Sequence, residues 1–408
     1  MKEAHRSIWE YLQKKWITVL AFLVLAMVVH GLFFRFTSAD LEIFLFDWFD
    51  YYDQVSIQEA FRNPISNYTG PYTYLLFISK LIQRGVSLLF NWELPDIVMI
   101  KLINIPFELL SVYAGMMTIH FYTKDERKLF YSFALLLFHP IVLINGAFWG
   151  QCDIIYTSFL LVSFLLLLYK KNFWAVFVFG IAFTFKFQAI FFSPLLLAFV
   201  LNRRLDWYCL AVVPLVYLSL HIPSMIAGRS LWNIIAIYFY QADSIPVLTA
   251  NAPNLYQFIP NLSASGVVIV RVIGLTLTVV LAVWYAARAA RHIELSDSLG
   301  VLLFACLVLI LMPFVLPSML DRYFFTAELF LLLFAIQNPK YWYLPLLITT
   351  ASLFAYFNSY AVINIGLNAA PAKLGSVLNS LVLIIVFFLF FKFTKREPGQ
   401  YDQVHSES

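Results

Sequence analysis

Charged residues are scarce in this sequence. Only 12% of its 408 residues are Asp, Glu, Lys or Arg, and 62% are hydrophobic, whereas a soluble globular domain is roughly 25% charged. This composition excludes a water-soluble protein and predicts one that crosses a membrane many times. The basic residues are spread over many short segments, so we expect no nucleic-acid partner.

Cysteine is also scarce, and the common metal and nucleotide motifs are absent. Cys152, Cys209 and Cys306 are far apart and lack the spacing of a metal site. We interpret them as small hydrophobic residues in the membrane. The sequence has no glycine-rich phosphate loop, no nucleophile elbow and no zinc-binding pattern. An ATP-driven machine is therefore disfavoured.

Long hydrophobic runs dominate what is present. Trp16–Phe34 is long enough to span a bilayer. It is longer than the apolar core of a signal peptide and no small-residue cleavage site follows it, so we expect it to remain as the first span. Eleven further runs are predicted to cross the membrane: 97–121, 129–145, 154–169, 173–185, 191–201, 207–221, 267–288, 300–316, 323–336, 342–357 and 374–393.

The positions of the basic residues predict the orientation. Lys and Arg gather before the first run, in the loop 123–128 and after the last run, and such clusters usually lie in the cytoplasm. The apolar segment 71–90 contains Lys80 and Arg84, which would be costly inside a span. We therefore predict that it is a surface or re-entrant helix, with both chain termini cytoplasmic.

The predicted fold is an all-α integral membrane protein with about twelve transmembrane helices. We expect a single domain, 1–408, with two large outer loops, 35–96 and 222–266, and a cytoplasmic tail, 394–408. Four histidines, His30, His120, His139 and His221, have no ligand-like spacing, and we interpret them as residues of the membrane interface.

The first outer loop holds the densest group of acids. Five fall within fourteen residues: Asp40, Glu42, Asp47, Asp50 and Asp53. Aromatic residues alternate with them at helical spacing: Phe44, Trp48, Phe49 and Tyr52. This pattern predicts a short helix that lies on the membrane surface with its acids outward and its aromatic rings inward. Asp40 is either a loop acid or helix N-cap, or a general base near the membrane surface.

Other outer turns supply further polar candidates. In the segment 145–153, Gly146 and Gly150 allow tight turns, and Trp149, Gln151 and Asp153 could line a polar cleft, although Asp153 is also a natural N-cap for the next helix. Four more side chains complete the set of polar candidates: Lys186, Gln188, Asn254 and Tyr256. Lys186 could instead snorkel to the interface, and loops favour Asn for its turn geometry.

The pair Asp321–Arg322 admits two interpretations. The two side chains could form an ordinary ion pair at a helix end, of little energetic value. Alternatively, the guanidinium could clamp a phosphate, because its forked donors match phosphate oxygens.

Taken together, these motifs resemble the GT-C superfamily of integral-membrane glycosyltransferases. Specifically, they are similar to bacterial proteins related to the second mannosyltransferase of GPI-anchor synthesis. The pieces that carry the resemblance are Asp40, 67–74 (NYTGPYTY), 149–153 (WGQCD), 186–188 (KFQ) and 316–324 (LPSMLDRYF). This sequence departs from the family pattern at Leu320, where the family often has histidine.

The resemblance implies an inverting transfer of a hexose from a polyprenyl-phosphate donor to a glycan, lipid or cell-envelope acceptor on the outer face of the bacterial cytoplasmic membrane. Asp40 would be the general base, and Arg322, helped by Lys186, would bind the donor phosphate. The sugar or acceptor would contact Glu42, Trp149, Gln151, Asp153, Gln188, Asn254, Tyr256 and Asp321. No cofactor is required, but Mg²⁺ or Mn²⁺ could bind between Asp40 or Glu42 and Asp153.

Two other functions remain open from the sequence. A flippase for a lipid-linked glycan would share the outer acids and the phosphate contacts, but it should also show inverted repeats and polar residues in both membrane halves. A polymerase of the outer face is expected to carry arginines in its long outer loops, where Arg229 is the one strong candidate. The concentration of acids on the predicted outer side favours an enzyme.

Overall fold

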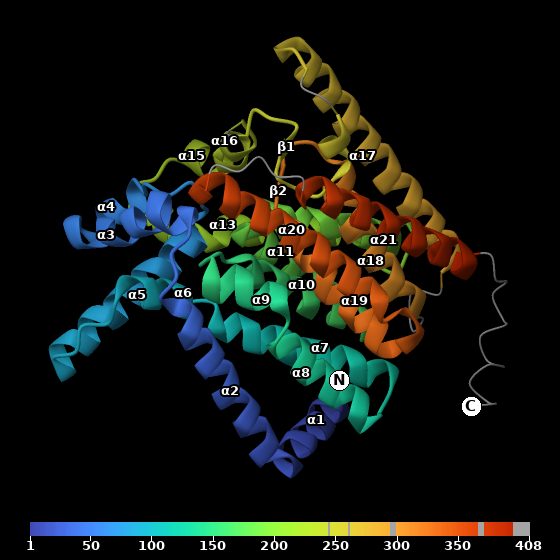
Figure 1. The fold of residues 1–408 in the computed structure, drawn as a ribbon, viewed down its shortest axis with the longest axis horizontal. Coiled ribbons are helices and arrows are strands. Elements are labelled where there is room, and N and C mark those ends of the chain that lie inside the picture. Colours follow the sequence, from blue (N-terminus) through green and yellow to red (C-terminus); the bar gives the residue numbers. More distant parts are fainter. Residues whose placement is uncertain (244, 260–261, 294–298, 366–370, 395–408) are drawn as a thin grey trace. The chain divides into compact units, whose positions relative to one another are not determined.

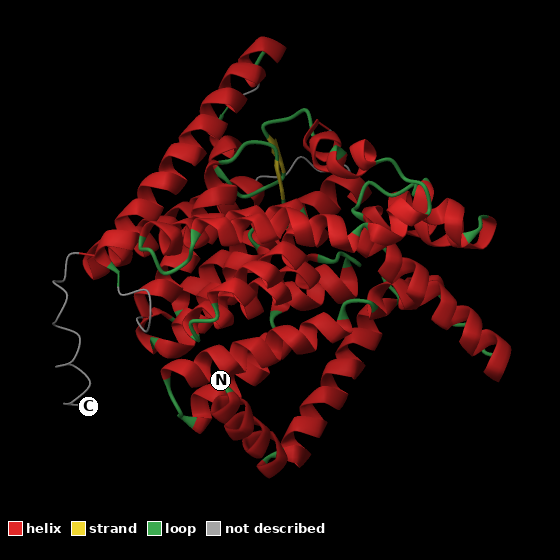
Figure 2. Ribbon diagram, turned by 180° about the vertical axis from the view of Figure 1, so that it is seen from behind, coloured by secondary structure: helices red, strands yellow, loops and turns green. Residues whose placement is uncertain are grey.

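The computed structural model describes residues 1–243, 245–259, 262–293, 299–365 and 371–394. Helices make up most of these ranges, and the strands in them are two short ones, β1 (Thr249–Ala250) and β2 (Met319–Leu320), as Figure 2 shows. All twelve predicted spans and the segment 71–90 are largely helical. The predicted all-α fold is confirmed. The predicted tail lies outside the described residues, except for Thr394.

The helices of the first half follow the apolar runs closely. In chain order they are α1 (Lys2–Lys14), α2 (Trp16–Phe34), α3 (Phe46–Gln54), α4 (Ile57–Arg62), α5 (Gly70–Phe90), α6 (Asp96–Leu102), α7 (Ile105–Tyr122), α8 (Glu126–Leu137), α9 (Pro140–Val142), α10 (Asp153–Leu168) and α11 (Asn172–Phe185). Two π-helical turns, η1 (Leu41–Leu45) and η2 (Leu143–Phe148), interrupt this series, and a 3₁₀ turn, η3 (Phe187–Phe192), follows it.

The second half begins with α12 (Ser193–Leu201), the 3₁₀ turn η4 (Trp207–Ala211) and α13 (Val212–Leu220). The predicted outer loop 222–266 contains short elements: α14 (Ile222–Ile226), α15 (Leu231–Ile235), α16 (Ile237–Asp243), β1 and the 3₁₀ turn η5 (Leu255–Phe258). The chain continues with α17 (Ala264–His292), α18 (Leu299–Val315), α19 (Phe325–Gln337), the 3₁₀ turn η6 (Pro339–Tyr341), α20 (Tyr343–Ile365) and α21 (Pro371–Thr394).

Among the residues that the structure describes, six helical segments are long and apolar enough to cross a membrane: Trp16–Phe34, Gly70–Phe90, Asp96–Tyr122, Glu126–Phe148, Ala264–His292 and Pro371–Thr394. Six shorter apolar helices of 10–17 residues accompany them. This supports a multi-pass membrane protein. The number of twelve spans, the orientation and the surface position of α5 stay predictions.

The chain forms two compact units that alternate along the sequence. The first comprises Met1–Ser163, Phe177–Ala189 and Ala211–Ile245, and the second comprises Phe164–Val176, Ile190–Leu210 and Pro246–Ser408. The single domain expected from the sequence stays a prediction, and we describe each unit by itself.

In the first unit, α2 ends where a buried lysine meets it. The Nζ of Lys101, in α6, donates to the carbonyl oxygens of Phe33 (3.2 Å), Phe34 (3.4 Å) and Phe36 (2.6 Å). A helix leaves its last carbonyls without internal partners, and a positive charge at this end is favoured by the helix dipole. Lys101 therefore fixes the point at which the chain leaves α2 and turns towards Asp40.

The polar N-terminal segment is itself a helix, which the sequence analysis did not predict. Figure 1 shows α1 meeting α2 in a sharp bend at Lys15. The buried face of α1 consists of Ala4, Ile8 and Tyr11, and the helix packs against α7. Its polar composition hid this amphipathic pattern, because the apolar residues fall on one narrow stripe.

The acids of the first outer loop hold α3 against α5. As predicted, Trp48, Phe49 and Tyr52 are buried while Asp47 and Asp50 are exposed, but Phe44 is exposed. The Nζ of Lys80 lies 2.7 Å from Asp53, 3.8 Å from Asp50 and 3.5 Å from Asp96. Burial alone would raise the pKa of Asp53, but hydrogen bonds from Lys80 and Arg84 outweigh it and lower that pKa. The lysine in α5 thus has carboxylate partners, which offset its burial.

The second unit is built around α18, whose residues Gly300–Val315 are all buried. It packs against α17, α19 and α21, and α20 packs against α21. The strands β1 and β2 pair in parallel, with Thr249 opposite Met319 and Ala250 opposite Leu320. This pairing fixes the segment before η5 beside the turn that carries Asp321 and Arg322.

Candidate functional site

The carboxylate of Asp40 is held by two nitrogen donors from the segment 149–151. Its Oδ2 accepts hydrogen bonds from Trp149 Nε1 at 2.8 Å and from Gln151 Nε2 at 2.7 Å. Asp40 is partly exposed. The N-cap interpretation of Asp40 is wrong, because its side chain makes no capping hydrogen bond and its backbone is already helical, with φ −65° and ψ −35°.

The orientation of Gln151 is fixed at both ends of its amide. The hydroxyl of Tyr68 donates to Gln151 Oε1 at 3.1 Å, while Nε2 donates to Asp40. The backbone is fixed as well, since Asn104 Nδ2 donates to the Gln151 carbonyl at 2.8 Å. These bonds determine the orientation of the Gln151 side-chain amide, whose N–H groups point towards Asp40.

The turn at Gly150 brings Trp149 and Gln151 to the same carboxylate. Gly150 has φ +78°, a conformation that other residues adopt at a cost. A Cβ at this position would lie 2.9 Å from Leu41 Cδ2. The tight turn predicted at Gly150 is confirmed, whereas Gly146 lies inside η2 and the prediction of a turn there is wrong. A Cβ at position 146 would lie 2.9 Å from Glu108 Oε1, so the Glu108 side chain would have to move.

Asp153 occupies different surroundings, at the start of α10. It is fully buried, and its carboxylate accepts hydrogen bonds from Lys186 Nζ at 2.5 Å and from Asn145 Nδ2 at 2.8 Å. The snorkelling interpretation of Lys186 is wrong, because the side chain is only 8% exposed. Its Nζ also lies 5.5 Å from the centre of the Tyr68 ring, so Tyr68 contacts both groups of side chains.

Two further candidates also belong to the first unit. Gln188 is buried in η3, and Glu42 is exposed on η1. The structure therefore brings together Asp40, Trp149, Gln151, Asp153 and Lys186, with Tyr68 and Asn145 as connecting residues that the site prediction missed.

The donor set does not fit a divalent metal. Within the described residues, no three His, Cys, Asp or Glu side chains form a group that could hold one. Asp153 already pairs with an ammonium, and Asp40 receives two N–H groups. Those donors point at the oxygen atoms that Mg²⁺ or Mn²⁺ would need. We derive no step through a metal.

In the second unit, Asp321 and Arg322 belong to a polar cluster with the loop that follows β1. Arg322 Nη1 lies 3.5 Å from Asp321 Oδ1, and Ser359 Oγ donates to Asp321 Oδ2. Asn251 Nδ2 donates to Ser359 Oγ at 3.0 Å. Both side chains of the pair are largely buried, with 11% of Arg322 and 7% of Asp321 exposed. The pair is therefore not a solvent-exposed ion pair at a helix end, which was one of the two interpretations from the sequence.

Asn254 and Tyr256 have structural roles. Asn254 Oδ1 accepts the backbone N–H of Tyr256 at 3.1 Å and so caps η5, and the Tyr256 hydroxyl donates to the Val315 carbonyl at 2.6 Å. Both residues are buried, Asn254 fully and Tyr256 with 4% exposed. Both side chains therefore fix the backbone here, and their contact with a sugar stays a prediction.

The position of the four histidines at the membrane interface stays a prediction. All four are buried, from 1% exposed at His221 to 8% at His120. His30 Nε2 shares a hydrogen bond of 2.7 Å with Glu108 Oε2, and His221 Nε2 accepts the backbone N–H of Gly70 at 3.2 Å. Glu108 was overlooked, although an acid inside the apolar run 97–121 is a signal of a buried polar partner.

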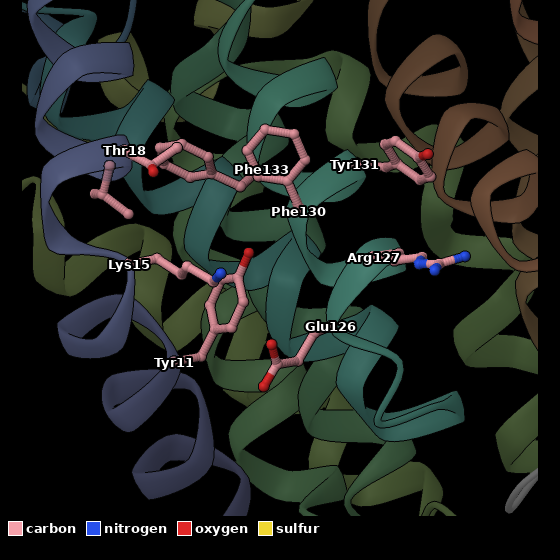
Figure 3. A pocket seen from close by; sticks show the side chains of 9 residues that line it. Tyr11, Lys15, Thr18, Glu126, Arg127, Phe130, Tyr131 and Phe133 are labelled. Atoms are coloured by element: carbon pink, nitrogen blue, oxygen red, sulfur yellow. The ribbon is translucent and has the colours of Figure 1, made fainter.

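Two cavities in the described part of the first unit bear on the site. One, of about 360 Å³, lies where α1 and α2 meet α8. Figure 3 shows Tyr11 and Lys15 on one side and Phe130 and Phe133 above, with Arg127 directed away from them. It adjoins the first residues of α2, whereas Asp40 follows the other end of this helix, which is about 28 Å long. We call Asp40 and the side chains linked to it, Trp149, Gln151 and Tyr68, the Asp40 network. The cavity is therefore separate from this network.

The second cavity, of about 410 Å³, is lined by Arg62, Asn63, Pro64, Ser66, Asn67, Arg229, Asn233, Ile237, Tyr240 and Gln241. We call it the arginine pocket. It is continuous in sequence with the Asp40 network, because Asn67 precedes Tyr68.

Comparison of the chain with protein-family models and with curated proteins gives no match. The function is therefore argued from the residues themselves.

Proposed function

We propose that the chain is an inverting membrane glycosyltransferase of the GT-C type. It would move a mannose-like hexose from a polyprenyl-phosphate donor to a glycan, lipid or cell-envelope acceptor outside the cytoplasm. The observation that carries this proposal is the partly exposed carboxylate of Asp40, oriented by Trp149 and Gln151. A general base must be positioned within hydrogen-bond reach of the proton that it takes.

In the proposed mechanism, Asp40 accepts the proton of the acceptor hydroxyl as that oxygen attacks the anomeric carbon. The new glycosidic bond forms on the face opposite the leaving phosphate, so the configuration inverts. The bond from the anomeric carbon to the phosphate oxygen breaks, and the lipid phosphate departs with the electron pair. Trp149 and Gln151 keep one carboxylate oxygen fixed during the reaction, which avoids the cost of reorienting it.

The leaving phosphate needs a positive charge, and we assign this contact to Arg322. A guanidinium suits the task because it presents two parallel donors to a phosphate and stays charged. Lys186 is a weaker candidate than the sequence suggested, because its ammonium is paired with Asp153 at 2.5 Å. We propose that Lys186 and Asp153 together keep the turn 145–153 in place beneath the sugar.

A carrier of lipid-linked glycans is the second candidate function. It is favoured by ionisable side chains buried inside apolar helices, namely Glu108 with His30 and the fully buried Glu328 of α19. Ionisable groups at membrane depth often mark a transport or proton path.

Transfer measured in purified, detergent-solubilised protein tests the proposal. A panel of polyprenyl-phosphate sugars is offered to the wild type, to Asp40→Asn and to Arg322→Ala. We expect wild-type transfer with at least one donor and its loss in Asp40→Asn with donor binding retained. No transfer with any donor, together with movement of a lipid-linked glycan across vesicles that is unaffected by Asp40→Asn, would establish the carrier instead.

A further inference from the structure

The arginine pocket has the composition of a binding site for a negatively charged sugar. Its volume of about 410 Å³ lies in the range of small-molecule sites, about 300–1,000 Å³. Five of the lining side chains are amides or hydroxyls, Asn63, Ser66, Asn67, Asn233 and Gln241, and Tyr240 adds a ring. Amides beside an aromatic ring provide donors, acceptors and a flat apolar surface, which suits a hydroxyl-rich ligand.

Two guanidinium groups line this pocket without a carboxylate among the lining residues. Arg62 comes from α4, and Arg229 from the turn between α14 and α15. The stem of Arg62 passes Gly228, with its Cδ 3.7 Å from the position that a Cβ would take there. Gly228 has φ +98°, so the chain adopts an unusual turn where it brings the two like charges to one cavity. Such a pair is unfavourable unless an anion lies between them.

Arg229 carries an incomplete set of hydrogen bonds. Its Nη1 is buried and has no hydrogen-bond partner among the residues that the structure describes. Burial lowers the pKa of the Arg229 guanidinium, yet an arginine remains charged at neutral pH. A buried charged donor without a partner is costly, and an anionic oxygen in the cavity would remove this cost.

The pocket is joined to the Asp40 network by a single peptide bond. Asn67 lines the pocket, and the next residue, Tyr68, donates to Gln151, which in turn donates to Asp40. Consecutive Cα atoms are about 3.8 Å apart. Gln241, also a lining residue, donates from Nε2 to the Asn67 carbonyl. A ligand in the pocket therefore contacts the segment that orients the carboxylate.

We propose that the arginine pocket binds an anionic sugar, one that carries a phosphate or carboxylate group, and that this sugar belongs to the acceptor. The role of this sugar as part of the acceptor rests on the proposed function, whereas the binding of an anionic sugar does not. Arg62 and Arg229 would bind the anionic group, and the amides of Asn63 and Asn233 would contact the hydroxyls.

Calorimetric binding to the full-length protein in nanodiscs of zwitterionic lipid tests the pocket directly. The probes are mannose 6-phosphate, glucuronic acid and neutral mannose. We expect both anionic sugars to bind more tightly than mannose, and Arg62→Gln and Arg229→Gln each to weaken them by about tenfold or more. The matched control is Arg127→Gln, which removes the same charge from the other cavity and should leave affinity unchanged.

Several outcomes would overturn the proposal. Mannose could bind as tightly as mannose 6-phosphate, or Arg229→Gln could behave like Arg127→Gln. If Arg229→Gln fails to fold, Asn233→Ala replaces it, because this side chain is exposed, and an unchanged affinity for mannose 6-phosphate in that variant would also refute the assignment.

Two further measurements distinguish a sugar ligand from a lipid headgroup and test the acceptor role separately from binding. Nanodiscs with phosphatidylglycerol should leave the affinity for mannose 6-phosphate unchanged, and competition by this lipid that disappears in Arg229→Gln would identify a lipid headgroup in place of a sugar. Binding is also measured in Asp40→Asn, where we expect the wild-type affinity. Arg229-dependent binding in a protein that shows no transfer would refute the acceptor role and leave the pocket assignment standing.

Discussion

Asp40 and Asp153 lie close to the same turn but in opposite surroundings. Asp40 is partly exposed and receives two neutral N–H donors, from Trp149 and Gln151. Asp153 is fully buried and faces the ammonium of Lys186 at 2.5 Å. Both acids were candidate site residues from the sequence. The side chains that contact each carboxylate distinguish them in the structure.

The difference indicates which acid can take part in chemistry. A general base needs access to substrate, and Asp40 is the partly exposed acid of the two. Asp153 is the counter-ion of a buried lysine, and a substrate hydroxyl would have to displace that lysine to reach it. A buried pair of this kind is costly to break. This contrast supports our proposal that Asp40 is the general base and that Asp153 stabilises the turn.

The largest effect expected from this comparison is on the rate of transfer. Asp40→Asn keeps the shape and the hydrogen bond to at least one donor but removes the proton acceptor, so we expect transfer to fall by about 10²–10⁴-fold. Initial rates with saturating donor measure it. Asp47→Asn, at an exposed acid of α3, is the control and should retain most activity. A larger loss in Asp47→Asn than in Asp40→Asn would contradict the assignment.

Asp153 should show its effect in stability. Asp153→Asn leaves the Lys186 ammonium buried without its counter-ion, and we expect a loss of about 3–5 kcal/mol in the free energy of unfolding. The double variant Asp153→Asn/Lys186→Met should recover much of it, because the unpaired charge is gone. Denaturant unfolding in detergent is the measurement.

A matched ion pair at the surface sharpens this test. Glu10→Gln breaks a contact with Arg6 in which both side chains are exposed, 59% and 81%, and this variant should cost less than about 1 kcal/mol. Equal losses in Glu10→Gln and Asp153→Asn would show that burial does not distinguish the two pairs.

A smaller effect is expected from the donors that orient Asp40. Trp149→Phe keeps the ring volume in part but removes the Nε1–H, and we expect transfer to fall by about tenfold with little change in stability. Trp92→Phe, at an exposed tryptophan, is the control for the general effect of losing an indole. A rate in Trp149→Phe equal to that in Trp92→Phe would mean that the hydrogen bond to Asp40 does not contribute.

The smallest expected effect concerns the turn itself. Gly150→Ala places a Cβ at φ +78° and against Leu41, and we expect a loss of about 1–2 kcal/mol in stability. Gly85→Ala, inside α5 with nothing within 4 Å of the new Cβ, should instead be neutral or stabilising by about 0.5–1 kcal/mol. Thermal unfolding measures the stability of both variants. Equal changes in stability would show that the turn at Gly150 is not strained.

Much of the fold could be predicted from the sequence, because apolar runs report helices directly. The first span coincides with α2, Trp16–Phe34. The helix α1 was missed because its polar residues outweigh the apolar stripe. The π-helical turns η1 and η2 were also missed, because the apolar pattern indicates a helix without distinguishing its type.

The candidate site was predictable as a set of residues but not as a network. The segment Trp149–Asp153 drew attention through its glycine and polar residues, yet the sequence could not assign the indole and amide to Asp40, more than 100 residues earlier. The same holds for His30 with Glu108, which are 78 residues apart. Asn254 and Tyr256 illustrate a different difficulty, because polar loop residues also serve to fix the backbone.

The most direct test of the central claim, that Asp40 accepts a proton during sugar transfer, is chemical rescue. Asp40→Ala opens space beside Trp149 and Gln151, and added formate can supply a carboxylate there. We predict that Asp40→Ala is nearly inactive, that formate restores transfer in a concentration-dependent way, and that Arg322→Ala is not rescued. Transfer by Asp40→Ala at the wild-type rate without formate would contradict the account.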